Sequence, residues 1–178
     1  MPAKDIRRRL ASWLVMALVG VVVYIFVTPS YRQGEPSVAG KKAENFGVVV
    51  DGRNKRLSDF RGKVVVLNFW ASYCGSCVEE LPDLNRLQER IRSRGGVILA
   101  VSVDEDCARY EDFLTKYPVR FQTSCEPTKK VSLDYGTEMI PETYVIDREG
   151  YIARKFVGAQ RWDSAEITKY FDATLSQN

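Results

Sequence analysis

The chain has 178 residues, with 26 lysines and arginines, 23 aspartates and glutamates, and no histidine. The first 27 residues carry four basic residues and one acid, and the remainder carries 22 of each, so the net charge of +3 lies at the N-terminus. The neutral remainder shows none of the basic excess that favours nucleic acid, so we expect no nucleic-acid partner. After an N-terminal segment is set aside, enough chain remains for one domain with a real core.

Residues 10–27 form an uncharged apolar segment directly after a basic cluster of Lys4 and residues 7–9. Its length is sufficient for a helix to span a bilayer. Because positive charges stay on the cytoplasmic side, residues 1–9 are predicted to be cytoplasmic. We therefore expect a single-pass anchor in the cytoplasmic membrane, with the rest of the chain on the extracytoplasmic face. A cleaved signal peptide has the same basic start and is the alternative, but no Ala-x-Ala site follows Val27.

Residues 28–42 combine proline, glycine, serine and charged residues with little apolar content, which predicts a tether. The folded domain is expected over residues 43–178. It begins with an apolar stretch at 48–50, a turn at 51–54 and a return at 55–57, a pattern that predicts a short hairpin.

A buried strand, a Cys-x-x-Cys motif and an amphipathic helix come next. Residues 64–69 form an unbroken apolar run apart from Asn68, and residues 78–91 repeat apolar side chains every three or four positions. This order places Cys74 at the first turn of the helix, where free backbone N–H groups and the helix dipole stabilise a thiolate. Cys77 lies one turn on, on the same side, and can close a disulfide with Cys74.

A Cys-x-x-Cys motif also occurs in zinc sites and in structural disulfides. A zinc site needs two further ligands, and the chain has no histidine and no second Cys-x-x-Cys, so no metal is expected. A structural disulfide is the other alternative, but the junction of a strand and a helix favours redox chemistry. Cys74 is therefore predicted as the nucleophile that attacks a disulfide and Cys77 as the resolving thiol.

The remaining pattern alternates strands and helices. The strand–helix–strand order around the motif predicts parallel pairing through a right-handed crossover. Asp104 or Asp106 can cap the next helix. The expected elements are strands at 97–103 and 119–123, a helix ending at 117, a short helix at 128–135, a hairpin of 142–146 with 151–157, and a last helix that starts after Asp163.

Residues 63–82 resemble the active-site segment of membrane-anchored thioredoxin-like proteins of the TlpA/ResA type, and the likeness extends through 57–63 and 139–147. The pattern of strands and helices predicts a mixed central sheet with helices on both faces, which is the α/β thioredoxin fold that the resemblance also implies. Here that fold would carry an added N-terminal β-hairpin and a strand–helix insert, and one transmembrane helix would precede it.

The resemblance also implies roles for four residues. Glu80 stands three residues after Cys77 on the same helical face, where a glutamate of the family is tied to thiol ionisation. Asn68 replaces the buried aspartate of thioredoxins, which leaves Glu80 as the local carboxylate. Ile140 and Pro141 match the family's cis-proline, beside which exposed backbone pairs with the substrate; Trp70 is expected to line the same substrate-binding site.

Cys107 and Cys125 lie outside the motif. Since exported domains keep disulfides, a structural bridge between them is one expectation. Two buried free thiols and a second redox pair that relays electrons are the alternatives.

These features predict an extracytoplasmic thiol-disulfide oxidoreductase that needs no cofactor. By resemblance it reduces disulfides of partner proteins, such as the haem-site cysteines of apocytochrome c, and is re-reduced by a transmembrane donor of the CcdA/DsbD type. A disulfide-forming oxidant on the same scaffold is the alternative. A Sco-like copper assembly factor and a peroxidase fit the motif less well.

Overall fold

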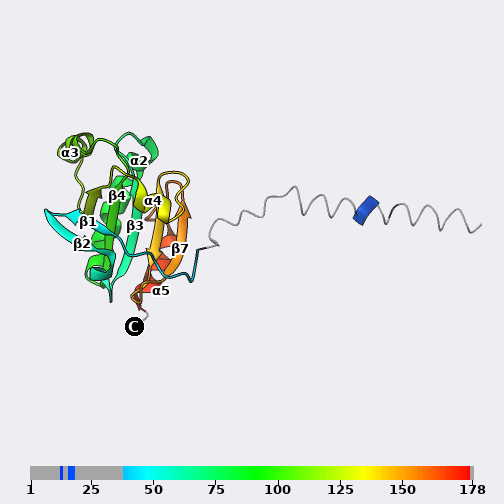
Figure 1. The fold of residues 1–178 in the computed structure, drawn as a ribbon. Coiled ribbons are helices and arrows are strands. Elements are labelled where there is room, and N and C mark those ends of the chain that lie inside the picture. Colours follow the sequence, from blue (N-terminus) through cyan, green and yellow to red (C-terminus); the bar gives the residue numbers. More distant parts are fainter. Residues whose placement is uncertain (1–12, 14–15, 19–37, 177–178) are drawn as a thin grey trace, which may run out of the picture. The chain divides into compact units, whose positions relative to one another are not determined.

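The computed structural model describes residue 13, residues 16–18 and residues 38–176 (Figure 1). The predicted anchor at 10–27 therefore falls almost wholly outside the described residues, and its four described positions are helical. No helix in these described ranges is both long and apolar enough to cross a bilayer. The predicted cytoplasmic residues 1–9 and most of the predicted tether also lie outside the described part.

A five-stranded mixed sheet forms the centre of the domain, with the strand order β5-β4-β3-β6-β7. Its strands are β3 (Val64–Trp70), β4 (Gly96–Ser102), β5 (Gln122–Cys125), β6 (Glu142–Ile146) and β7 (Ile152–Val157). The β3, β4 and β5 strands run parallel, while β6 and β7 are antiparallel to their neighbours. Since β3 and β4 are buried along their whole length, their continuous apolar runs are explained by helices and loops on both faces.

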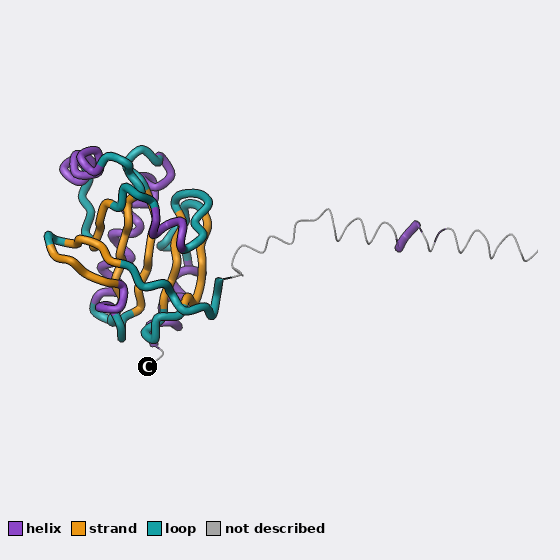
Figure 2. The backbone as a smooth tube through the Cα atoms, viewed as in Figure 1, coloured by secondary structure: helices purple, strands orange, loops and turns teal. Residues whose placement is uncertain are grey.

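Two long helices cover one face of the sheet. They are α2 (Gly75–Arg92) and α5 (Ala165–Ser176), and they share a core with Val64, Val66 and Ile98. The other face is covered by α4 (Lys130–Asp134), the 3-10 turn η1 (Leu57–Phe60) and the strands β1 (Gly47–Val50) and β2 (Arg53–Arg56). Antiparallel pairing joins β1 to β2 around the turn at Asp51 and Gly52. Figure 2 shows the strands side by side with helices in front of and behind them.

Two boundaries differ from expectation. Residues 38–42, predicted as the end of the tether, belong to the domain, because Gly40 and Lys41 exchange backbone hydrogen bonds of 2.8 Å with Ile152. The strand predicted at 119–123 is wrong by about three residues: β5 covers Gln122–Cys125, where it pairs with β4. Pairing with β4, not the apolar run, decides where this edge strand begins.

The carboxyl ends of β3 and β4 meet two helix beginnings. The helix α3 (Cys107–Lys116) starts there, capped by Asp106, and α2 starts directly after β3. Figure 1 shows α3 and the α2 label at the same end of the sheet. A separate apolar cluster around Trp70, Cys77, Tyr110 and Phe113 fills this end. The parallel arrangement therefore places the Cys-x-x-Cys motif among the loops at the carboxyl end of the sheet.

Candidate active site

Cys74 and Cys77 form a disulfide, with their Cα atoms 5.3 Å apart. Cys74 is also the N-cap residue of α2, and its Sγ accepts a hydrogen bond from the backbone N–H of Cys77 at 3.2 Å. The hydroxyl of Ser76 lies 3.5 Å from the same sulfur. A thiolate on Cys74 would therefore sit at the positive end of the helix with a donor already in place, which is where thiol pKa values fall.

The two cysteines differ in access to solvent. Cys77 is buried against Trp70 and Leu81, whereas Cys74 is half-buried and is followed by the exposed Gly75 and Ser76. Tyr73, just before Cys74, is 64% exposed. This asymmetry leaves Cys74 the more accessible of the two cysteines.

The loop that carries Pro141 lies opposite Cys74. The Ile140–Pro141 peptide bond is cis, as predicted, and the carbonyl oxygen of Ile140 lies 3.9 Å from Sγ of Cys74. Met139, one residue earlier, is 57% exposed. A backbone carbonyl beside the reactive sulfur, flanked by exposed apolar side chains, suits the binding of an extended peptide.

Glu80 is buried beneath the motif, with 4% of its surface exposed, while its neighbour Glu79 faces solvent. Its Oε1 accepts a hydrogen bond from Nδ2 of Asn68 at 3.2 Å. Its Oε2 accepts one from the backbone N–H of Gln160 and one from Nε1 of Trp162, both at 3.1 Å. The carboxylate is thus held in one orientation by three donors, one from β3 and two from the segment between β7 and α5.

Burial raises the pKa of Glu80 from 4.5 to about 7, although the three hydrogen bonds act in the opposite direction. Desolvation wins because a charged carboxylate loses more water than these donors replace. A carboxyl group with this pKa can take up or release a proton near neutral pH, which is the requirement for a general base. Glu80 follows Cys77 by one helical turn, so the two side chains share a face of α2.

The side chain of Trp70 has little surface that a substrate could contact. Its side chain is buried, and its ring packs on Tyr110 and Phe113 with centroids 6.0 and 5.1 Å away. Trp70 thus packs behind Cys77, and its contact with a substrate stays a prediction. Tyr73 and Met139 are large exposed side chains at this end of the sheet.

Cys107 and Cys125 are joined by a second disulfide, with Cα atoms 5.8 Å apart. It connects the first residue of α3 to the last residue of β5. Of the three alternatives left open by the sequence, the structure contains the bridge.

Sequence reasoning missed a buried ion pair directly after the cis-proline. Glu142 and Lys155 pair at 2.7 Å, with 2% and 15% of their side chains exposed. The hydroxyl of Tyr144 lies 3.0 Å from Oε2 of Glu142 and 2.8 Å from the carbonyl oxygen of Tyr135, and it donates its one hydrogen to either of them. These contacts fasten β6 and β7 to the start of the loop that carries Ile140. Sequence position alone could not reveal the pair, because its members are 13 residues apart on two strands.

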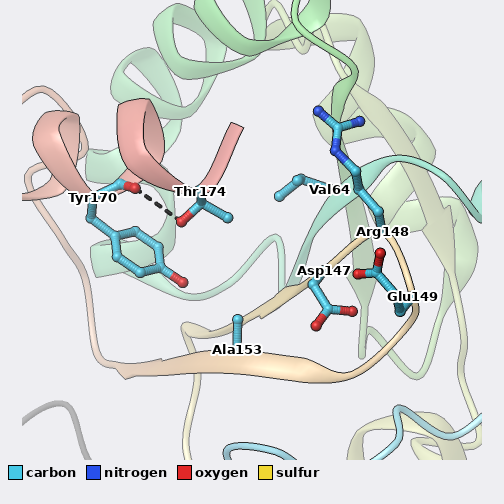
Figure 3. Close-up of a pocket in the computed structure, with 7 residues that line it drawn as sticks. All are labelled: Val64, Asp147, Arg148, Glu149, Ala153, Tyr170 and Thr174. Carbon is cyan, nitrogen blue, oxygen red and sulfur yellow. Dashed lines mark hydrogen bonds between the residues drawn. The ribbon is translucent and has the colours of Figure 1, made fainter. Parts of the chain in front are cut away.

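A cavity of about 300 Å³ lies away from the disulfide (Figure 3). It is bordered by Val64 at the beginning of β3, by residues 147–149 of the β6–β7 turn, and by Tyr170 and Thr174 of α5. Because Cys74 follows the other end of β3, this cavity plays no part in the site described above.

Comparison with known proteins agrees with this geometry. Residues 39–155 match the AhpC/TSA family. The chain is 30% identical to the thiol-disulfide oxidoreductase ResA of Bacillus subtilis (strain 168), over 85% of this chain and 87% of that protein. It is 29% identical to ResA of Bacillus thuringiensis (strain Al Hakam), over 86% and 89%. A crystal structure of a putative thiol:disulfide interchange protein DsbE from Chlorobium tepidum superposes with a TM-score of 0.74 at 30% identity, over 78% of this chain and 98% of that one.

Proposed function

Because the chain belongs to the AhpC/TSA family and is a ResA-like thiol-disulfide oxidoreductase with a thioredoxin-like fold, we propose that it reduces disulfides of partner proteins outside the cytoplasm. The observation that carries this proposal is the carboxyl group of Glu80. It is buried one helical turn from the resolving Cys77, and its pKa is about 7. A reductant must release its substrate by ionising a buried thiol, and this carboxylate is the local base for that step.

The reaction proceeds in two exchanges. The thiolate of reduced Cys74 attacks one sulfur of the partner's disulfide, which forms a mixed disulfide and frees the partner's other sulfur as a thiolate. Cys77 then loses its proton towards Glu80, and its sulfur attacks Sγ of Cys74. The mixed disulfide breaks, and the partner's two thiolates become thiols by taking up the proton held by Glu80 and one proton from water. The partner has gained two electrons, and the enzyme is left with the Cys74–Cys77 disulfide present in this structure.

The substrate chain would lie between Tyr73 and the loop of Ile140. The Ile140 carbonyl, 3.9 Å from Sγ of Cys74, faces the same space as the reactive sulfur and can accept a backbone hydrogen bond from an extended peptide. The exposed ring of Tyr73 and the exposed thioether of Met139 provide apolar surface beside this space. Such a site recognises backbone more than sequence, which suits a protein disulfide as substrate.

The finer assignment joins this chemistry to the family resemblance. We propose that the substrate is the cysteine pair of a Cys-x-x-Cys-His haem-attachment site in apocytochrome c, and that a transmembrane thiol donor of the CcdA/DsbD type returns the electrons. The anchor predicted at residues 10–27 would keep the domain at the outer side of the cytoplasmic membrane.

Reduction of synthetic peptides tests this assignment. The reduced domain should reduce an oxidised peptide with a Cys-x-x-Cys-His segment, and the Cys77→Ser variant should instead accumulate a mixed disulfide between Cys74 and the peptide, seen by mass spectrometry without reductant. Cys74→Ser serves as the control and should form no adduct. If the wild-type domain leaves the peptide oxidised while it reduces other protein disulfides, the haem-site assignment is wrong and the general reductase activity stands.

A further inference from the structure

Asp104 is a buried carboxylate at the end of β4 that the reaction described above does not use. Only 1% of its surface is exposed. Its Oδ2 accepts a hydrogen bond from the backbone N–H of Ser72 at 2.8 Å, and its Oδ1 accepts one from the Ser72 hydroxyl at 2.6 Å. The hydroxyl of Ser102 donates to Oδ2 as well. These three donors are neutral, so the charge of the carboxylate is not matched by a cation at these contacts.

Ser72 belongs to the turn that presents the nucleophile. It stands two residues before Cys74, and the backbone N–H of Cys74 donates to the carbonyl of Ala71 at 3.1 Å. The same turn is tied at its beginning, where the N–H of Val103 donates to the carbonyl of Trp70 at 2.8 Å. The residues that follow β4 therefore hold the residues that follow β3, and Asp104 makes two of the connecting bonds.

The Cys107–Cys125 disulfide encloses the segment that carries Asp104. Cys107 follows Asp104 by three residues, and Cys125 is paired in register with Ser102 on the neighbouring strand. The sulfur of Cys125 lies 3.5 Å from the carbonyl oxygen of Asp104. The N–H of Glu126 donates to the carbonyl of Ser102 at 2.8 Å. The bridge thus fixes the loop between β4 and α3 from both sides. The side chain of Asp104 in this loop reaches the active-site turn.

We propose that Asp104 is a positioning residue for Cys74 and that the Cys107–Cys125 disulfide braces it. Through Ser72, Asp104 fixes the turn from which the nucleophile projects. Its buried negative charge also opposes the thiolate of Cys74, because like charges at low dielectric disfavour each other. The second disulfide, which touches neither reactive cysteine, would in this way influence their reactivity. This role requires only thiol-disulfide exchange at Cys74. It does not depend on the direction of electron flow or on the substrate proposed above.

The first test measures the thiolate of Cys74 directly. The reduced domain is alkylated with iodoacetamide across a pH series, and mass spectrometry follows the Cys74 peptide. Asp104→Asn keeps the shape and a hydrogen-bonding oxygen but removes the charge, so the pH midpoint should fall by about one unit. Asp106→Asn is the matched control, because Asp106 is exposed in the same loop and caps α3 instead of binding Ser72. Its midpoint should stay at the wild-type value.

A second variant separates charge from packing. Ser72→Ala removes one neutral donor from the carboxylate and leaves its charge less compensated, so the midpoint should rise slightly, in the opposite direction from Asp104→Asn. Loss of structure alone would move both variants the same way. Equal midpoints for wild type and Asp104→Asn, or shifts of the same sign in both variants, overturn the role of Asp104.

The brace is tested by combining variants. Cys107→Ser/Cys125→Ser should move the midpoint in the direction of Asp104→Asn, because the released loop lets the carboxylate move away from the active-site turn, whereas Ser72→Ala keeps it there through the backbone N–H of residue 72. Adding Asp104→Asn to the double serine variant should then change the midpoint by less than it does in wild type, since the two changes act through one contact. An unchanged midpoint in the double serine variant, or a fully additive shift, shows that the second disulfide does not act through Asp104.

Discussion

Trp162 donates a 3.1 Å hydrogen bond from its indole Nε1 to Oε2 of Glu80, and both side chains are buried. Trp162 lies between β7 and α5, so the C-terminal part of the chain orients a carboxylate on the active-site helix. The ring of Trp162 is itself held by Phe156, with centroids 5.3 Å apart. The carboxyl group that would serve the resolving cysteine is thus fixed by residues about 80 positions away in the sequence.

Replacing Glu80 by glutamine should slow the release of the substrate. Glutamine keeps the size and an acceptor oxygen but cannot take a proton, so we expect the resolution of a mixed disulfide at pH 7 to slow by about 100-fold. Rapid-quench measurement of mixed-disulfide decay gives this rate. Glu79→Gln, at the exposed neighbouring position, is the control and should react like wild type. Equal decay rates in both variants would remove Glu80 from the mechanism.

The raised pKa of Glu80 also makes stability depend on pH. The folded carboxyl group has a pKa of about 7 and the unfolded one 4.5, so between these values the folded state binds more protons. The contribution to stability is full below pH 4.5 and is lost as pH rises to 7, by about 3 kcal/mol in total. Denaturant unfolding of the oxidised domain across this range should show the loss, and Glu80→Gln should lack that component. A parallel pH dependence in the variant would contradict the assignment.

The buried pair of Glu142 and Lys155 should be costly to break. Lys155→Met leaves the Glu142 carboxylate buried without a cation, and we expect the free energy of unfolding to fall by about 3–5 kcal/mol. Lys130→Met is the control, because Lys130 pairs with Asp134 at the surface and 73% of its side chain is exposed. Urea unfolding of both variants at pH 7 makes the comparison, and a similar small effect in the two would show that the buried pair is dispensable.

Loss of the second disulfide should lower stability independently of its effect on the active site. The bridge closes a loop of 18 residues, and the loop-entropy estimate gives about 3 kcal/mol for such a loop. Chemical unfolding of the Cys107→Ser/Cys125→Ser variant, with the Cys74–Cys77 pair kept oxidised, measures the difference. Alkylation of the native protein without reductant is the accompanying check, and modification of Cys107 or Cys125 would show that the bridge is not formed.

The local part of the site could be predicted from sequence because strand, motif and helix are contiguous. Cys74, Cys77 and Glu80 lie within seven residues, and helical geometry places Cys77 one turn from each of the other two. The cis bond before Pro141 followed from the family resemblance. The mixed sheet with helices on both faces also followed from the alternation of patterns, whereas the position of β5 did not, since an edge strand is set by its partner.

The supporting polar contacts could not be predicted, because they join distant parts of the chain. Asp104 was considered only as a helix cap, yet Asp106 takes that role and Asp104 turns inward to Ser72. A polar residue next to a buried strand has no sequence signal that separates a cap from a buried acceptor. Trp70 shows the converse: an aromatic residue beside the motif suggested a substrate contact, and tertiary packing against α3 buries it.

The reduction potential of the Cys74–Cys77 pair tests the central claim most directly. It is measured by equilibration of the wild-type protein with a glutathione or dithiothreitol buffer, and alkylation with mass spectrometry follows the redox state of the Cys74–Cys77 pair. A reductant of partner disulfides should have a potential near the roughly −270 mV of thioredoxin. A potential near the roughly −120 mV of DsbA would mean that the protein forms disulfides instead, and the proposal of a reductase, with its cytochrome substrate, would be wrong.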